Sequence, residues 1–285
     1  MLDELVAALV CPYCREPLTL MPGNLRCPNG HHFDIARQGY ANLLPGDAQT
    51  GTADTAAMVE ARDTFLGEAH FAPIERALAE VAVRLLADGP EGCVVDVGAG
   101  TGRYLAAVLD AVPGRLGLAL DISKFAARRA AKAHPRIAAV VCDAWRPLPV
   151  RTASAALVLD VFAPRNAAEF ARVLASGGAL VVVTPTARHL GELIGPLGML
   201  TVDPLKAERL AEGMADRFTR VESIEVEEPM ALDRADVAAV VAMGPSARHS
   251  APGVLASRIA DLPEPVEVTV SVTVSVYRPL DRNGA

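Results

Sequence analysis

Near the amino terminus, residues with soft side chains are spaced to bind a metal ion. Cys11 and Cys14 form a Cys-x-x-Cys pair, and after twelve intervening residues Cys27 is followed by His31 and His32. Each pair can form a short turn that presents two ligands to one tetrahedral ion, as in structural zinc sites. A closed set of three cysteines and one histidine leaves no position for water, so we expect the zinc to be structural. The fourth ligand is either His31 or His32.

A glycine-rich turn in the middle of the chain predicts a second ligand site. The sequence VVDVGAGTGRY places Asp96 two residues before the run Gly98-x-Gly100-x-Gly102. Glycines let the backbone bend tightly and let a ligand lie against it. Dinucleotide sites usually have the spacing G-x-G-x-x-G, and an acid beside the turn would repel their pyrophosphate. An acid there favours a ligand with an ammonium group, and S-adenosylmethionine is such a ligand.

Two further acids fit the same ligand. Asp121 ends the next apolar run, where its carboxylate could accept hydrogen bonds from both ribose hydroxyls. Asp143 ends the run after that and could reach the adenine amino group. Acids at the carboxyl ends of neighbouring parallel strands lie at one edge of a sheet, where such folds bind their ligands. Together with the glycine turn, the acids predict a class I S-adenosylmethionine-dependent methyltransferase with a doubly wound, seven-stranded sheet.

The elements that must hold these residues in place alternate along the chain. Apolar runs read as strands, and segments with apolar residues at helical spacing lie between most of them. We expect strands at 93–98, 115–121, 137–143, 155–161 and 179–185, with helices at 74–87, 103–112, 123–134 and 167–175. This alternation predicts an α/β fold with a mainly parallel sheet.

The carboxy-terminal part adds predicted helices at 203–218 and 233–243 and a strand at 221–228. Residues 265–279 alternate strictly between apolar and polar residues, which predicts an antiparallel strand with one wet face at an edge of the sheet. We divide the chain into a zinc-binding module (1–35), a linker and cofactor-covering segment (36–75) and a methyltransferase domain (76–285). Pro45–Thr55 is expected to be a mobile loop.

Composition limits the function. The 285 residues are 51% hydrophobic and carry a net charge of -7. A protein that held nucleic acid only through a basic surface would not be acidic, so any RNA contact must be local. We find neither a signal peptide nor a run of about 18 apolar residues that could span a membrane. These features favour a cytoplasmic protein without a membrane partner and leave a homodimer open.

Several distinctive motifs resemble one family over nearly the whole chain. They are CPYC, CPNGHHFD, GYANLLP, EARDTFLGEAHFAP, DVGAGTG, DISKFAARRAAK, FAP and TPTARHL. The chain is similar to the RlmA family of 23S ribosomal RNA (guanine-N1)-methyltransferases, and resembles the Gram-positive branch that includes the tylosin-resistance enzyme. The resemblance implies that the substrate is a hairpin loop of 23S rRNA near the macrolide site, where the two branches of the family modify neighbouring guanines. Methylation there could give macrolide resistance.

The resemblance also assigns residues. It implies that the zinc ligands are Cys11, Cys14, Cys27 and His31. Gly100 and Thr101 match the family's cofactor turn. Phe71 falls where the family has an aromatic residue against the cofactor, and His189 matches a histidine near the cofactor.

The proton acceptor is not identified by any motif. Guanine N1 carries a proton at neutral pH that must be accepted or stabilised elsewhere. Asp160, at the end of the fourth predicted strand, is the candidate for this role, while Glu169 on a helix is expected to be structural. For RNA binding we expect contacts on the zinc module from Arg15, Arg26 and Arg37.

Two alternative functions compete with this one. The net acidity would suit a small-molecule methyltransferase of the same fold, but a small substrate needs no rigid docking module. A non-catalytic zinc-dependent binding protein would not need the complete set of acids and glycines. Methyl transfer to 23S rRNA, compared with transfer to a metabolite pool, would distinguish these functions.

Overall fold

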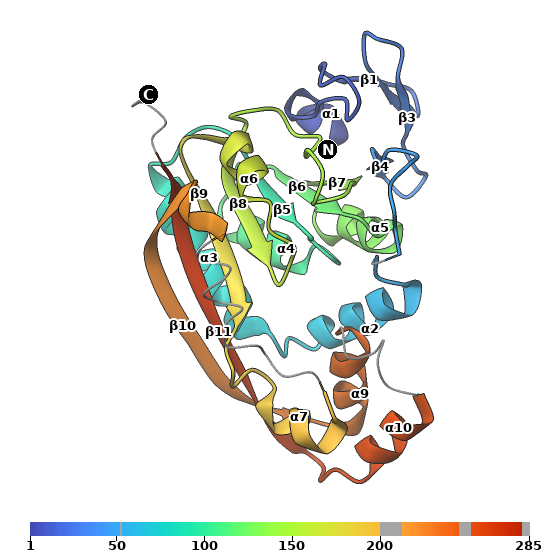
Figure 1. Cartoon of the computed structure of the whole chain (residues 1–285), viewed down its shortest axis with the longest axis vertical. Helices are drawn as coiled ribbons and strands as arrows, with labels where there is room; N and C mark the ends of the chain where they lie inside the picture. Colours follow the sequence, from blue (N-terminus) through green and yellow to red (C-terminus); the bar gives the residue numbers. More distant parts are fainter. Residues whose placement is uncertain (52, 200–212, 245–251, 281–285) are drawn as a thin grey trace.

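Figure 1 shows the computed structural model, which describes residues 1–51, 53–199, 213–244 and 252–280. Its centre is an eight-stranded sheet with the strand order β10-β11-β9-β8-β5-β6-β7-β4. The strands from β9 to β4 are parallel to their neighbours, and β11 runs antiparallel to both β9 and β10. The strands span Tyr40–Asn42 (β4), Cys93–Val97 (β5), Gly117–Asp121 (β6), Ile137–Val141 (β7), Ala155–Val161 (β8), Leu174–Pro185 (β9), Phe218–Leu232 (β10) and Val266–Pro279 (β11). The predicted doubly wound α/β fold is confirmed.

Three helices cover one face of the sheet. They are α3 (Ala72–Ala87), α4 (Arg103–Ala111) and α5 (Lys124–Ala133), and their apolar side chains share one hydrophobic core with the strands. The Ser123 side chain accepts a hydrogen bond from the N–H of Ala126, so it caps α5 as predicted. A second group of helices, α2 (Ala56–Gly67), α7 (Gly191–Leu197), α9 (Arg234–Ala242) and α10 (Pro252–Ala260), lies in the lower part of Figure 1.

The amino-terminal module covers part of the other face of the sheet. It contains α1 (Leu2–Leu5), the 3-10 turn Val6–Ala8 and a small antiparallel sheet of β1 (Thr19–Met21), β2 (Asn24–Arg26) and β3 (His32–Asp34). Parallel strands are usually joined by a helix that packs on the sheet, but the connection from β7 to β8 contains none. The module and α6 (Ala167–Val173) fill that layer instead. Apolar residues of the module, among them Leu9, Leu25 and Phe33, share one core with Val140, Leu148 and Val150.

Because of this packing, residues 1–35 are not separated from the rest of the chain in the way that the predicted division at residue 35 suggests. The module has no separate hydrophobic core, and Leu9 pairs with Val150 through an isolated β-bridge. The segment 36–75 is likewise more than a linker, because β4 pairs with β7 at the edge of the main sheet. The sheet therefore has eight strands rather than the predicted seven. The first helix of the domain, α3, begins at Ala72 and so crosses the predicted boundary at residue 76.

Two further predictions about single elements were wrong. β11 does not lie at the edge of the sheet but between β9 and β10, and its expected wet face is largely covered. Ser271 and Ser275 on that face are buried. The helix expected at 167–175 ends at Val173, because β9 begins at Leu174 and continues through the two glycines that were expected to stop the helix.

The helix predicted at 203–218 falls mostly outside the described residues. The helix predicted at 233–243 forms as α9, and a capping box between Asp233 and Asp236 begins it. In the described part of the chain, no helix combines the length and apolar character that crossing a membrane requires.

Candidate zinc centre and cofactor site

The four predicted zinc ligands lie together in the amino-terminal module. The ligand atoms of Cys11, Cys14, Cys27 and His31 are all within 4.8 Å of one another. His31 Nδ1 lies 3.2 Å from Cys27 Sγ and 3.5 Å from Cys11 Sγ. The neighbouring His32 is exposed and accepts a hydrogen bond from Arg26 Nε at 3.1 Å, so it is not part of the cluster. Three sulfurs and one imidazole nitrogen at these separations fit a tetrahedral zinc ion.

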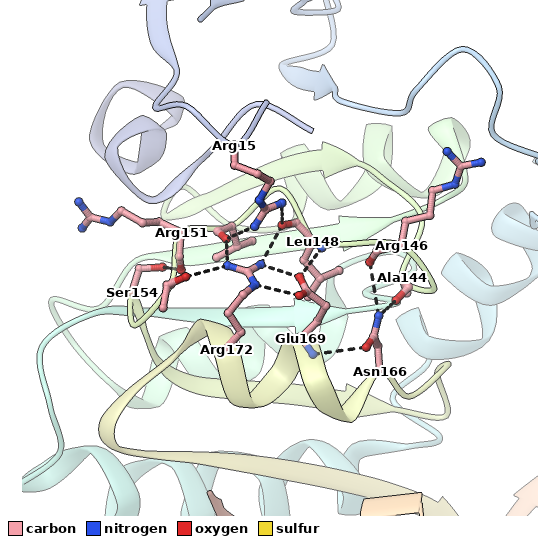
Figure 2. A network of polar contacts seen from close by, with 11 residues as sticks. Arg15, Ala144, Arg146, Leu148, Arg151, Ser154, Asn166, Glu169 and Arg172 are labelled. Carbon is pink, nitrogen blue, oxygen red and sulfur yellow. Dashed lines mark hydrogen bonds and ion pairs between the residues drawn. The ribbon is translucent and has the colours of Figure 1, made fainter. Parts of the chain in front are cut away.

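A polar network joins the zinc cluster to the main sheet (Figure 2). Arg15, next to Cys14, donates from Nη1 to the Leu148 carbonyl at 2.8 Å. Arg172 on α6 donates to the same carbonyl at 3.0 Å and to the Val150 carbonyl at 2.7 Å. Glu169 accepts hydrogen bonds from Arg172 and from the N–H of Leu148, so one carboxylate joins α6 to the segment before β8. Arg15 is therefore an internal contact, whereas Arg26 and Arg37 are exposed.

The glycine turn connects β5 to α4 and takes the shape that the sequence requires. Gly98, Gly100 and Gly102 have φ angles of 75°, 55° and 80°, which is the left-handed region that favours glycine. A Cβ atom at Gly98 would lie 2.5 Å from Cβ of Ala163, so the turn packs closely against the segment after β8. A Cβ atom at Gly100 would meet only the side chain of Arg62, at 3.4 Å.

The three predicted acids lie at the carboxyl ends of adjacent strands. Asp121 accepts hydrogen bonds from the N–H groups of Gly100 at 2.8 Å and Ser123 at 2.7 Å. Its carboxylate therefore holds the glycine turn in place at the carboxyl edge of the sheet. Asp143 accepts from the N–H of Trp145 at 2.9 Å. Asp96 is buried, and both of its carboxylate oxygens lack a hydrogen-bond partner among the described residues.

Asp160 is a second buried acid without a regular hydrogen bond. It lies at the end of β8, the neighbour of β5, and Nε of Arg165 is 3.4 Å from its Oδ1. Burial raises the pKa of Asp96 to about 8 and raises the pKa of Asp160 well above its ordinary range. The guanidinium of Arg165 and the N–H of Ala163 only partly offset the effect on the pKa of Asp160. Buried, unpaired carboxyl groups are costly and are typical of sites that await a cation.

His189 and Phe71 belong to a group of packed rings. The ring centroids of Phe71 and His189 are 5.5 Å apart, and Phe65 lies edge-on to Phe71 at 5.0 Å. His189 Nδ1 accepts a hydrogen bond from the N–H of Ser271 at 3.2 Å, and burial lowers the pKa of His189 to about 4. The imidazole is therefore neutral at pH 7. Phe71 is buried, which fits an aromatic core contact.

Sequence reasoning missed two residues at this site. Arg62 on α2 forms an ion pair with Asp54, donates to the Met243 carbonyl at 3.0 Å and lies over Gly100. Phe162 follows β8 directly and stacks on His189 with 5.7 Å between centroids. Both residues occur in distinctive motifs, EARDTFLG and FAP, but nothing in their spacing distinguishes them from ordinary core or surface residues.

Comparisons with protein families match two parts of the chain. Residues 9–50 match the family described as "RlmA, N-terminal", a zinc ribbon, and residues 94–178 match the family described as a methyltransferase domain. The first match spans the zinc cluster and β4. The second spans the glycine turn and the three acids.

Curated relatives match almost the entire chain. A 23S rRNA (guanine(748)-N(1))-methyltransferase of Streptomyces fradiae is 49% identical over 98% of this chain and 100% of its own length. A protein of Micromonospora griseorubida, named as a candidate 23S rRNA (guanine-N(1)-)-methyltransferase, is 50% identical over 97% of this chain and 99% of its own length. Among solved structures, the YcgJ protein of Bacillus subtilis matches 73% of this chain and 100% of its own, with a TM-score of 0.48 and 16% identity.

Proposed function

This chain belongs to the RlmA family of 23S rRNA (guanine-N1)-methyltransferases, and we propose that it methylates N1 of the guanine that corresponds to guanine 748. The choice of this nucleotide rests on the Streptomyces fradiae relative, whose name specifies guanine 748 and which aligns with 98% of this chain. Ribosomal RNA is a cytoplasmic substrate, so we also assign the protein to the cytoplasm.

The observation that best supports methyl transfer is the buried Asp96 beside a glycine turn, because both of its carboxylate oxygens lack a hydrogen-bond partner among the described residues. S-adenosylmethionine, when bound, supplies an electrophilic methyl group on a sulfonium centre. Asp143 and Asp121, at the ends of β7 and β6, are suited to bind adenine and ribose. Asp96, at the end of β5, is suited to pair with the ammonium group. The protein then contributes orientation, which is the main task in a transfer between two bound partners.

The proton of guanine N1 has to leave during the reaction. His189 is unsuited to accept it, because Nδ1 already accepts the Ser271 N–H and the ring proton therefore lies on Nε2. Asp160 is the candidate acceptor, because burial raises its pKa toward the range in which a carboxylate can take a proton. Arg165, with Nε 3.4 Å from Oδ1 of Asp160, favours the ionised carboxylate and so opposes this rise of the pKa.

Transfer of labelled methyl groups to RNA tests this function. The full chain would be incubated with labelled S-adenosylmethionine and either 23S rRNA that lacks the modification or a metabolite pool. We expect label in the RNA and a block to reverse transcription at the guanine corresponding to 748, since an N1-methyl group prevents base pairing. Label in metabolites would favour a small-molecule methyltransferase, and no transfer would favour a non-catalytic zinc protein.

Macrolide resistance is a further part of the proposal. Expression of the chain in a tylosin-sensitive host should raise the tolerated tylosin concentration. A cofactor-binding variant such as Gly100→Arg, expressed at the same level, should not. Equal tolerance with both proteins would separate the methylation activity from resistance.

The buried Asp96 makes cofactor binding depend on pH. Its pKa of about 8 means that it is protonated at neutral pH without a ligand and must ionise to pair with an ammonium group. We expect the affinity for S-adenosylmethionine to rise between about pH 6 and pH 7.5, by up to about tenfold per unit. In Asp96→Asn the affinity should be lower and nearly independent of pH. Calorimetric titrations at several pH values measure the affinity and its dependence on pH. If the slope of log affinity against pH were the same in the variant as in the wild type, a group other than Asp96 would lose the proton on binding, and Asp121 would be the first to test.

The same group affects stability in the absence of cofactor. Because the pKa of Asp96 is raised in the folded state, the folded chain holds a proton that the unfolded chain has lost between its ordinary value of 3.8 and about 8. The free energy of unfolding should therefore fall as the pH rises through this interval. Added S-adenosylmethionine should raise the melting temperature more at the upper end of the interval than at the lower end.

Exposed arginines of the zinc module are expected to contact RNA phosphates. We predict that Arg26→Gln combined with Arg37→Gln weakens binding of the rRNA hairpin and lowers the slope of log affinity against log salt by about 1.4 to 1.8. Cofactor affinity should not change, since neither residue lies at the glycine turn. Arg76→Gln with Arg220→Gln, on α3 and β10, is the matched control for net charge. If both double variants had the same slope, RNA docking by the module would be refuted.

A further inference from the structure

Phe162 is held in an unusual backbone conformation that keeps its ring at the surface. Its φ angle is 55°, in the left-handed region that costs energy for a residue with a Cβ atom, and its side chain is 40% exposed. All the aromatic residues of the chain lie in its described part. Four of them have exposed side chains, Tyr13, Phe125, Trp145 and Phe162, and Phe162 alone among these has a positive φ. Core packing alone does not account for a ring that is 40% exposed and held at a positive φ, which points to a function in binding.

A row of packed rings connects Phe162 to the hydrophobic core. His189 stacks on Phe162 with 5.7 Å between centroids and an interplanar angle of 28°. Behind His189 lie Phe71, at 5.5 Å, and then Phe65, at 5.0 Å from Phe71, both buried. The Ser271 N–H fixes the His189 ring, and the next residue, Leu190, also has a φ of 55°. The exposed ring therefore rests on a rigid and uncharged support.

The order of the strands puts this ring at the strand end next to the proposed cofactor site. Adjacent strands lie about 4.8 Å apart, and the carboxyl ends follow one another in the order β7, β6, β5, β8. If Asp143 and Asp121 bind the nucleoside and Asp96 binds the ammonium group, the end of β8 is the next strand end beyond the ammonium group. Phe162 is the first residue after β8, and its neighbour Ala163 packs against Gly98 of the cofactor turn.

We propose that Phe162, supported by His189, is the stacking surface for the target guanine. This inference rests on the proposed RNA methyltransferase function and names the residue that holds the base. Enzymes that modify a base within folded nucleic acid bind it unpaired, commonly by stacking on flat side chains. A guanine lying on Phe162 would lie at the carboxyl end of β8, the strand that also carries Asp160. Phe162 thus fixes the plane of the base, while Asp160 stays the candidate for its proton.

Kinetics on the rRNA hairpin test the stacking surface. Loss of a base–aromatic stack should lower kcat/KM for RNA by about 5- to 150-fold in Phe162→Ala, whereas Phe162→Tyr should stay within about threefold of the wild type. The affinity for S-adenosylmethionine should not change in either variant. Phe125→Ala is the matched control, because Phe125 is exposed to the same extent, 39%, on the first turn of α5, and should have normal kcat/KM.

Two additional measurements separate stacking from folding. Phe162→Gly relieves the left-handed strain, so it should melt at or above the temperature of Phe162→Ala and still lose activity. A hairpin with 2-aminopurine in place of the target guanine should change fluorescence on the wild type and on Phe162→Tyr but not on Phe162→Ala or Phe162→Gly. Normal kcat/KM for Phe162→Ala would overturn the proposal. A wild type that methylates no RNA would instead overturn the proposed function.

Discussion

Cys14→Ser is expected to unfold the whole chain and not only the zinc module. Without one of its four ligands the zinc ion should be lost, and the turns that carry Cys11 and Cys27 would no longer be held. The module contributes Leu9, Leu25 and Phe33 to the core that covers one face of the main sheet. Each buried side chain of this kind is worth about 1.5–3 kcal/mol. Losing several of them approaches the roughly 5–15 kcal/mol by which a typical domain is stable.

His31 and His32 provide a matched pair for this prediction. His31→Ser should lose zinc and soluble protein as Cys14→Ser does, because His31 belongs to the cluster. His32→Ser should keep about one zinc per chain and a normal melting temperature, because His32 is exposed and contacts only Arg26 in the hydrogen bonds described. Metal analysis and thermal unfolding measure both properties. A Cys14→Ser protein that lost zinc but kept a normal melting temperature for the methyltransferase core would show that the module is an independent domain.

The network around Arg15 explains why the two parts should unfold together. Arg15 and Arg172 both donate to the carbonyl of Leu148, and Glu169 balances their charge. If the module detached, the Arg15 guanidinium would lose its acceptors, the carbonyls of Leu148 and Val150, which adds to the cost of separating the two parts. Glu169 is thus structural, as its position on a predicted helix suggested.

The parts of the fold that the sequence predicts are those encoded by local patterns. β5, β7 and β8 are buried on both faces, and such strands appear as continuous apolar runs. The zinc ligands follow from spacing alone, apart from the choice between His31 and His32. The glycine turn follows from the φ angles that Gly98 and Gly100 must adopt.

The parts that it does not predict depend on contacts between distant segments. β4 has only three residues, too few for any periodicity, and exists because it pairs with β7. In β11, alternation of valine with serine indicated a wet face, but the Ser271 hydroxyl is buried where it hydrogen-bonds Thr186 at 2.6 Å. One feature of the sequence does indicate where the zinc module packs. The absence of a helical pattern between 143 and 154 leaves a layer of the sheet uncovered, and the zinc module was available to fill it.

Gly100→Arg is expected to abolish binding of S-adenosylmethionine in a chain that still folds. The side chain would begin where we propose that the cofactor lies against bare backbone, and it would bring a positive charge next to a cationic ligand. A like-charge contact of this kind costs several kcal/mol, which corresponds to a loss of affinity of about 100-fold or more. The fold should tolerate the change at the cost of local strain at a φ of 55°, since a Cβ atom at Gly100 meets no backbone and comes no closer than 3.4 Å to the Arg62 side chain.

Substitutions at two other glycines distinguish the effect of backbone strain from the effect on cofactor binding. Gly114 has a φ of 82° and open space where a Cβ atom would lie, so Gly114→Arg carries a similar backbone strain far from the acids and should bind the cofactor normally. At Gly98 an added Cβ would lie 2.5 Å from Ala163, so Gly98→Ala should lower the melting temperature of the protein itself. Calorimetry measures the affinity, and fluorescence of the single tryptophan, Trp145, beside Asp143 gives an independent signal. Normal affinity in Gly100→Arg would mean that the ligand does not lie on this turn, and the buried acids Asp96 and Asp160 would then need another cation to explain them.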